Sequence, residues 1–329
     1  MAIAHRARTT VLACALALAC AAPASAQAAE EFEAVGVPIE PIRITDRVYY
    51  VRGQAGMVSG ENEGFNSNAG FVVTDDGVVV FDALGTPALG AALLEAIGEI
   101  TAQPVRRVII SHYHSDHFYG LQAFEAAGAE IWADERVRGY LATDAPAARL
   151  AERRESLWPW VNEKSRIVAP DHHVSGITRF ALGGIDFTVL PAGPAHTDED
   201  LMLLVEQESV LFAGDVMFAG RVPYVGEADS GAWLEALDRL AEIAPRHVVT
   251  GHGPHSDDVV ADVDLTRRYL RYLRKAMGEA IEDLETFEEV YERTDWAEFE
   301  HLPAFEAANR VNAYNTYLLM QREALRTGN

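Results

Sequence analysis

Short apolar runs separated by turn residues fill the first part of the chain and predict β-strands. The expected strands are residues 41–44, 48–51, 70–74, 77–81 and 105–110. Asp75-Asp76 lies between two of these runs and predicts a hairpin. From Pro87 to Ile100 the apolar residues recur at helical spacing instead, which predicts an amphipathic helix.

The same mixture of patterns continues to about residue 250. Helices are expected at 118–128, in two segments between Asp134 and Arg154, and at 231–243. Strands are expected at 129–132, 178–180, 185–190, 201–205, 210–212 and 247–250. Two strand-rich blocks, each with its own helices, predict an α/β fold in which two sheets pack face to face with helices outside.

The pattern changes to purely helical after residue 256. Apolar residues keep i, i+4 spacing from Leu265 to Ile281, and a second helical pattern runs over 303–326. An acidic, aromatic stretch from Asp283 to Glu300 separates them. We therefore expect a main domain over 41–256 and a C-terminal helical extension over 257–329, with a structural cap as the favoured role of the extension.

The N-terminus has the pattern of a secretory signal peptide. Arg6 and Arg8 precede an apolar run over 11–22, and Ala24-Ser25-Ala26 is a good cleavage site. We expect a signal peptide at 1–26, a linker or arm at 27–40, and a periplasmic or secreted product. Anchoring as a lipoprotein through Cys20 is the less favoured alternative, because the residues before it form a poor lipobox. No other segment is long enough to span a membrane, so no membrane anchor is expected.

Composition narrows the partners and the chemistry. The formal net charge is −23, which argues against nucleic acid and anionic lipid and leaves a small-molecule substrate. Both cysteines, Cys14 and Cys20, fall inside the expected signal peptide, so thiolates are not available as ligands in the mature chain. The pattern does not indicate an oligomeric state.

Three histidines and an aspartate lie within six residues directly after the apolar run 105–110. They are His112, His114, Asp116 and His117. Imidazole and carboxylate groups crowded at the end of a buried strand suit Zn²⁺ or a similar borderline metal. His112 and His114 alternate with one residue between them, so both can point the same way from an extended backbone.

This stretch resembles the HxHxDH signature of the metallo-β-lactamase superfamily. Its further ligand positions have counterparts in His196, Asp215 and His252. The resemblance covers about residues 45–255 and implies a four-layer αββα sandwich. Its ligand types are those of the glyoxalase II-like branch, and the whole chain looks most like exported SoxH-like zinc metallohydrolases.

The resemblance implies two Zn²⁺ ions, with iron as an alternative metal. One ion would be held by His112, His114 and His196, the second by Asp116, His117 and His252, and Asp215 would bridge them. Asp116 would also act as the catalytic residue that orients hydroxide and moves a proton. Asp82, at the end of an expected strand, would support a ligating histidine from outside the ligand set.

Three functions follow from the resemblance. We favour hydrolysis of an ester, thioester or related bond, because β-lactamases of the superfamily have cysteine or serine where Asp215 stands. Activity on β-lactams is an alternative, because the protein is expected to be exported to the compartment where β-lactams act. A mononuclear iron persulfide dioxygenase is another, and a metal-bearing protein without turnover is disfavoured by the complete ligand set.

Several residues are open to two readings. The Gly-rich loop 53–66 forms either a flap over the site or a plain connection. Trp158-Pro159-Trp160 either lines a substrate cleft or packs into the core under a loop. His172 and His173 are expected in a solvated loop. His255, three residues after His252, is a less favoured candidate for the wall of the cleft.

Overall fold

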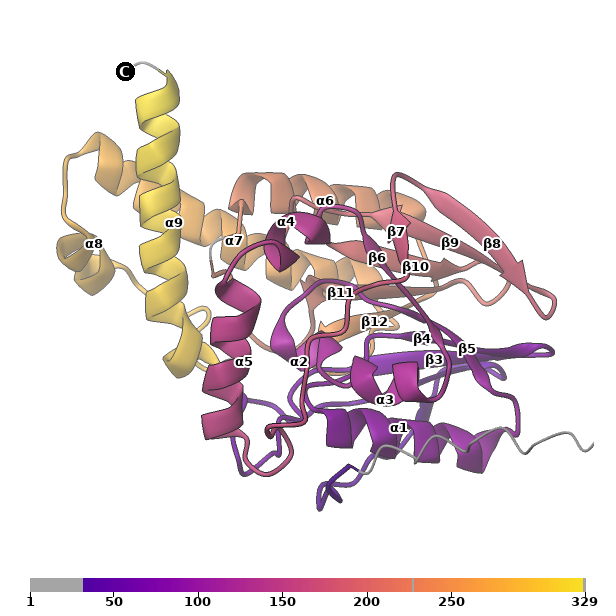
Figure 1. Ribbon diagram of the computed structural model, residues 1–329. Coiled ribbons are helices and arrows are strands. Elements are labelled where there is room, and N and C mark those ends of the chain that lie inside the picture. Colours follow the sequence, from indigo (N-terminus) through magenta and orange to yellow (C-terminus); the bar gives the residue numbers. More distant parts are fainter. Residues whose placement is uncertain (1–31, 227, 328–329) are drawn as a thin grey trace, which may run out of the picture. The chain divides into compact units, whose positions relative to one another are not determined.

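The computed structural model describes residues 32–226 and 228–327, which form two β-sheets with helices on their outer faces (Figure 1). The expected signal peptide lies outside the described residues. Residues 32–40 have no regular secondary structure, but Val35, Val37 and Ile39 pack against a buried cluster. Among the described residues no helix combines the length and the apolarity needed to cross a bilayer.

The first sheet has seven strands in sequence order. They are β1 (Ile42–Arg43), β2 (Val48–Val51), β3 (Ala69–Thr74), β4 (Gly77–Phe81), β5 (Val105–Ile109), β6 (Glu130–Asp134) and β7 (His172–Val174). Strands β1 to β4 pair antiparallel, and β4 to β7 pair parallel. Asp75-Asp76 turns between β3 and β4, which confirms the predicted hairpin.

The second sheet has five strands in the order β12-β11-β10-β9-β8. They are β8 (Thr178–Leu182), β9 (Ile185–Pro191), β10 (Leu201–Val205), β11 (Val210–Phe218) and β12 (His247–His252). Only β11 and β12 pair parallel, and their register shifts at Gly214 and again before Phe218. The irregular pairing lets β11 continue past the strand end expected at residue 212 and carries Asp215 within the strand.

The apolar faces of the two sheets form one buried cluster between them. Phe81 of β4 stacks on Phe212 of β11 with ring centroids 5.6 Å apart, which joins one sheet to the other. Valines dominate the strands on both sides because β-branched side chains fit a pleated, buried surface. The sheet-on-sheet core predicted from the sequence is therefore present.

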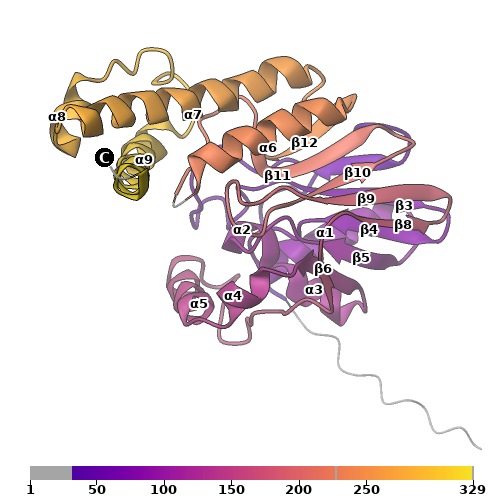
Figure 2. The same ribbon diagram turned by 90° about the horizontal axis from the view of Figure 1, so that it is seen from above.

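Helices cover the outer face of each sheet (Figure 2). On the first sheet lie α1 (Pro87–Ile100), α2 (Ser115–Phe118) and α3 (Leu121–Ala126); α6 (Ser230–Ile243) and α7 (Val259–Glu282) lie on the second. Thr86 begins α1 by accepting a hydrogen bond from the backbone N–H of Leu89, which is an ordinary N-cap. These layers confirm the αββα sandwich.

The C-terminal extension consists of α7, α8 (Phe287–Arg293) and α9 (Phe305–Thr327). Both long helices were predicted. The stretch between them was assigned no element, yet it contains α8, which begins with a capping box between Thr286 and Glu289. Ala308 and Ala313 of α9 are buried in the cluster under the second sheet, so the extension packs on the sandwich.

Two local predictions are corrected by the structure. His172 and His173 belong to β7, because their backbone pairs with Trp132 and Ala133 of β6, although His172 is solvent-exposed as expected. The helix expected at 118–128 is divided into α2 and α3 and begins earlier, at Ser115. The remaining helices of this region are α4 (Val137–Leu141) and α5 (Ala145–Ser156).

Trp158 and Trp160 follow neither of the two readings. The side chain of Trp158 is 59% exposed, so it does not plug the core. The indole of Trp160 donates a hydrogen bond to the carbonyl of Ala34 at 3.2 Å, which ties the N-terminal arm to the domain. Neither tryptophan lines the cavity described below.

Candidate metal centre

The seven predicted ligands meet where strands of both sheets end. His112, His114, Asp116 and His117 follow β5, and the last two lie in α2. His196 lies in the loop between β9 and β10, Asp215 lies within β11, and His252 ends β12. Strand ends that converge at one edge of the sandwich thus bring together residues far apart in the sequence.

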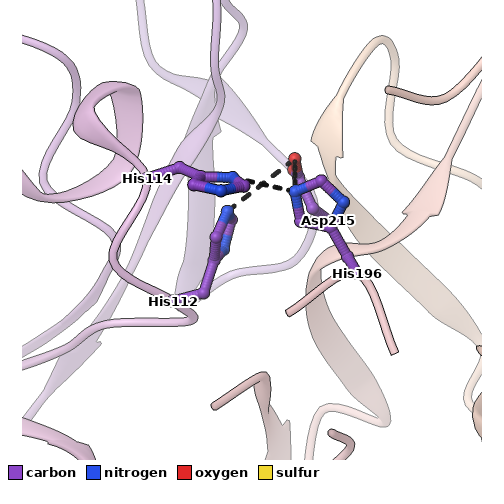
Figure 3. A group of neighbouring side chains, drawn as sticks. All are labelled: His112, His114, His196 and Asp215. Carbon is purple, nitrogen blue, oxygen red and sulfur yellow. Dashed lines mark hydrogen bonds and ion pairs between the residues drawn. The ribbon is translucent and has the colours of Figure 1, made fainter. Parts of the chain in front are cut away.

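One group consists of His112, His114, His196 and Asp215, whose ligand atoms all lie within 4.8 Å of one another (Figure 3). The Nε2 of His196 is 2.9 Å from Nδ1 of His114 and 3.3 Å from Oδ2 of Asp215. The Nε2 of His112 lies 3.9 Å from the same Oδ2. Three imidazoles therefore converge on one carboxylate oxygen.

The second group consists of Asp116, His117 and His252. The Nε2 of His252 is 3.4 Å from Oδ2 of Asp116, and that of His117 is 3.8 Å from it. The other oxygen of Asp215, Oδ1, lies 3.3 Å from His117 Nε2 and 3.4 Å from His252 Nε2. Asp215 thus presents one oxygen to each group.

The residues present fit divalent metal ions. His112 Nε2, His117 Nε2 and Asp215 Oδ1 are buried and have no hydrogen-bond partner in the described part of the chain. Buried polar atoms in folded proteins are nearly always paired, so three such atoms facing one another suit a shared partner from outside the chain. Imidazole nitrogen and carboxylate oxygen are the donors that zinc and similar ions take.

The back sides of two histidines are held by one carboxylate. Oδ2 of Asp82 lies 2.8 Å from Nδ1 of His117 and also accepts the hydroxyl of Ser111 at 2.8 Å. That hydroxyl in turn lies 2.9 Å from Nδ1 of His112. Asp82 therefore fixes which nitrogen of His117 faces the group, as the resemblance implied, and reaches His112 through Ser111.

A third histidine is held by the backbone. Nδ1 of His252 lies 2.7 Å from the carbonyl oxygen of Asn66, which leaves Nε2 facing the second group. The side chain of Asn66 donates to Oδ2 of Asp116 at 3.0 Å. Sequence reasoning missed both Asn66 and Ser111, because neither belongs to the ligand motif.

Close backbone packing shapes the space around Asp215. A Cβ atom on Gly251 would lie 1.9 Å from Oδ1 of Asp215, so only glycine fits at this position. The neighbouring strand end is tied to the other sheet by Asn68, whose side-chain amide donates to the carbonyl oxygens of Thr250 and Gly253 at 2.8 and 2.9 Å.

The electrostatics of the site favour the metal-binding protonation state at Asp215 and His196, whereas at His117 they favour the protonated ring, whose Nε2 proton a metal would have to displace. Burial opposes ionisation of Asp215, but the surrounding histidines, foremost His252, outweigh burial and hold the pKa of this carboxyl well below its usual range. Burial lowers the pKa of His196 to about 3, so its ring is neutral at pH 7. Burial would also lower the pKa of His117, but nearby carboxylates, foremost Asp215, raise it well above its usual range.

A cavity of about 270 Å³ opens onto both groups. Its walls outside the two groups are partly aromatic, from Tyr113, Tyr140 and Tyr224, and partly basic, from Arg149, Arg153 and Arg221. Met57 and Val58 also line it, so the Gly-rich loop 53–66 forms part of the wall, as the flap hypothesis expects. An adjoining cavity of about 470 Å³ is lined in part by Asp198, Glu199 and Asn315.

The other histidines of the described residues do not line this cavity. His255 packs against Tyr50 with ring centroids 5.4 Å apart and does not line the cleft. His247 pairs with Asp257, with 2.6 Å between Nδ1 and Oδ1.

Thr197, beside His196, donates its backbone N–H and its hydroxyl to the buried carboxylate of Asp200 at 2.7 and 3.0 Å.

Comparisons with known proteins agree on one family. The family model of the metallo-β-lactamase superfamily matches residues 62–252. The type 2 metallo-β-lactamase of Elizabethkingia meningoseptica is 24% identical over 212 residues, which are 62% of this chain and 77% of that protein. The name describes the activity of that protein, and at 24% identity its substrate cannot be assigned to this chain.

Two solved structures share the fold. A metallo-β-lactamase from Pontibacter korlensis superposes with a TM-score of 0.55 at 23% identity, over 71% of this chain and 99% of that one. The stereoselective inverting sec-alkylsulfatase from Pseudomonas sp. gives a TM-score of 0.64 at 18% identity and covers 85% of this chain. The match spans only 50% of the sulfatase.

Proposed function

Since the chain belongs to the metallo-β-lactamase superfamily, a family of metal-dependent hydrolases, we propose that it is a dinuclear zinc hydrolase acting on an ester, thioester or related bond. The observation that carries the proposal is the position of Asp215. Its Oδ2 faces His112 and His196, and its Oδ1 faces the second group. A carboxylate with one oxygen toward each of two ligand groups supports this proposal, because such a group would be able to bridge two ions.

In this proposal, His112, His114 and His196 hold one ion. Asp116, His117 and His252 hold the second, and Asp215 is shared. Two divalent ions held there would supply an activated water at neutral pH and polarise the bond that is attacked. Neither a serine nor a cysteine nucleophile is required for such chemistry.

The chain's own residues position the reaction. Asp116 lines the cavity and is the proposed acceptor of the proton that leaves the attacking water. Asn66 donates to Oδ2 of Asp116 at 3.0 Å and so orients the carboxylate. Asp82, by holding Nδ1 of His117, keeps Nε2 free for a metal.

The proposed bond follows from the residue at position 215. By resemblance, aspartate there is typical of ester, thioester and phosphodiester hydrolases, while β-lactamases use cysteine or serine. Both cysteines of the chain lie at positions 14 and 20, so no thiolate is present among the described residues. Hydrolysis of β-lactams and oxidation of persulfides by a single iron are the outcomes that would replace this proposal.

Metal analysis of the purified protein, expressed with both zinc and iron in the medium, tests the proposal. We expect about two zinc ions per chain by elemental mass spectrometry, and turnover of esters or thioesters within a panel that includes β-lactams and phosphodiesters. Asp215→Ala should lose metal and most turnover. The matched control is Asp186→Asn, on the exposed surface of β9. One iron per chain, or full activity in Asp215→Ala, would contradict the proposal.

We also propose that the protein is exported, by removal of residues 1–26. The basis is the sequence pattern described above, which lies outside the described residues. Expression in a Gram-negative host, followed by intact-mass measurement on the periplasmic fraction, should find a chain that begins at Gln27. A cytoplasmic chain that keeps these residues, or a lipid-modified Cys20, would overturn this part of the proposal.

A further inference from the structure

Arg221 is a buried cation on the wall of the cavity. It lies in the segment between β11 and α6, its residue is 4% exposed, and it lines the same cavity as His196, Asp215 and His252. Its Nε donates to the carbonyl oxygen of Val222 at the long distance of 3.4 Å. Over residues 32–226 and 228–327, no carboxylate forms an ion pair with it.

A buried guanidinium without an ion pair needs a reason to persist, and the ring of Phe218, whose centroid lies 5.9 Å from Cζ of Arg221, offers only a distant cation–π contact. Removing a guanidinium from water without pairing it costs free energy, and arginine cannot avoid the cost by losing its proton. Burial lowers the pKa of Arg221, while Asp215 and Asp116 raise it from a distance. In the proposed function those two carboxylates serve the metal ions, so they do not satisfy the guanidinium.

Two further arginines line the cavity from α5. The guanidinium groups of Arg149 and Arg153 both lie 3.4 Å from one carboxylate, that of Glu152, which therefore balances only one of them. Apart from Asp116 and Asp215, every charged side chain that lines this cavity in the described part of the chain is an arginine or a histidine. In a chain of net charge −23, a positive wall at one cavity runs against the overall charge.

We propose that Arg221 binds an anionic group of the substrate, a carboxylate, sulfate or phosphate that is separate from the bond cleaved at the metal pair. Arg149 and Arg153 add to the attraction from α5. The inference rests on the proposed function and narrows it, since the substrate becomes an ester or thioester that carries a negative charge. A planar guanidinium is suited to such a group because it can donate two parallel hydrogen bonds.

The segment that carries Arg221 is fixed from the C-terminal extension. Asn312 of α9 accepts the backbone N–H of Val225 at 2.8 Å and donates to the carbonyl oxygen of Pro223 at 2.7 Å. The N–H of Val222 donates to the carbonyl oxygen of Pro303 at 3.2 Å. The backbone that follows Arg221 is therefore held in place before any ligand arrives, which reduces the ordering needed on binding.

The experiment compares charged and neutral substrates on the zinc-loaded enzyme. The acetate esters of 4-hydroxybenzoate, 4-hydroxybenzenesulfonate and 4-hydroxyphenylphosphonate are measured beside that of neutral 4-hydroxybenzamide. In Arg221→Gln, kcat/KM for at least one charged ester should fall about 10- to 100-fold, with the amide unchanged. Arg221→Lys should retain part of the preference. The charged ester with the largest loss identifies the anionic group.

Arg179→Gln is the matched control, because it removes one positive charge from an exposed position on β8, outside the cavity. It should leave all four esters unchanged. Zinc content and thermal unfolding are measured for every variant. Because Arg221 lacks an ion pair among the described residues, Arg221→Gln should keep both zinc ions and unfold at a temperature no lower than the wild type. A lower unfolding temperature, lost zinc, or an equal loss on charged and neutral esters would show a structural role and overturn the proposal.

Failure of the proposed hydrolase function would be seen separately. If the wild type cleaves none of the four esters, binding of 4-hydroxybenzoate, 4-hydroxybenzenesulfonate and 4-hydroxyphenylphosphonate is measured by titration calorimetry against 4-hydroxybenzamide. Tighter binding of one anion, weakened about 10-fold or more in Arg221→Gln but not in Arg179→Gln, would support the anion site without the reaction. Equal binding of the anions and the amide would overturn it.

Discussion

Asp82 and His117 face each other across 2.8 Å, buried, with the carboxylate on the side of the ring that is turned away from the candidate metal centre. Burial raises the pKa of Asp82, while His117 acts in the opposite direction. The same carboxylate accepts the backbone N–H and the hydroxyl of Ser111. One side chain thus orients the loop that follows β5 and the histidine that the loop presents.

Replacement of Asp82 should weaken metal binding without removing any ligand. In Asp82→Asn one of the two accepting oxygens becomes an NH2 group, which would face either the backbone N–H of Ser111 or Nδ1 of His117, so the ring of His117 loses its fixed orientation. We expect metal affinity to fall about 10- to 100-fold. Competition with a chromogenic chelator measures it, and Asp186→Asn on the exposed surface of β9 is the control. Unchanged affinity in Asp82→Asn would refute the supporting role.

Gly251→Ala should displace Asp215 and empty the centre. The added methyl would lie 1.9 Å from Oδ1 of Asp215, so the carboxylate or β12 has to move. We expect loss of metal at both groups, because Asp215 faces both. Gly98→Ala is the matched control: no atom lies within 4 Å of its added methyl, and a helical position favours alanine by about 0.5–1 kcal/mol. Full metal content in Gly251→Ala would be inconsistent with the close contact.

Asn312→Ala should affect substrate binding more than metal binding. The change removes the hydrogen bonds to Val225 and Pro223 and leaves buried backbone groups unpaired, which costs about 1–3 kcal/mol of unfolding free energy. We expect KM to rise more than kcat falls, with zinc content unchanged. Val311→Ala, at a half-exposed position of the same helix, is the control. If zinc content and activity fall by the same factor, Asn312 supports the fold as a whole rather than the substrate-binding wall, and the prediction is wrong.

Asp200 should make stability depend on pH. Burial raises the pKa of its carboxyl well above the usual range, against the hydrogen bonds from Thr197. The folded state therefore binds this proton more tightly than the unfolded state, whose aspartate pKa is about 4. The stabilising contribution is full below that pH and is lost as the pH rises through the higher folded pKa.

Urea unfolding of the wild type and Asp200→Asn, both freed of metal with a chelator, measures this dependence. The variant cannot ionise, so its stability relative to the wild type should increase as the pH is raised from about 4 toward neutral. A difference that stays constant over this range would show that Asp200 ionises as readily in the fold as in the unfolded chain.

Much of the centre could be predicted from the sequence because its ligands are dense and follow strands. His112 to His117 form one local motif, and His196, Asp215 and His252 each lie near a recognisable strand. The hydrogen bonds that hold the ligands could not be predicted in this way. Asn66 contacts His252 and Asn68 contacts Thr250 across more than 180 residues, and no local pattern marks either asparagine.

The missed elements differ in how far the sequence signalled them. The stretch Thr286 to Glu289 has the capping-box spacing, so the start of α8 was readable. In contrast, β7 is only three residues long and exists because β6 offers a parallel edge, which is a tertiary effect. Arg221 carried no signal, since a single arginine in a loop is common and only its burial beside the centre distinguishes it.

The hydrogen bonds between Asn312 of α9 and the segment after β11 assign two parts of the proposed function to two parts of the chain. The residues that would perform hydrolysis are all in place by His252, whereas the wall that would select what is hydrolysed depends on Asn312. If the proposals hold, mutations in α9 should change substrate selectivity without altering the metal ligands. Related proteins could therefore differ in substrate through changes in their C-terminal helices alone.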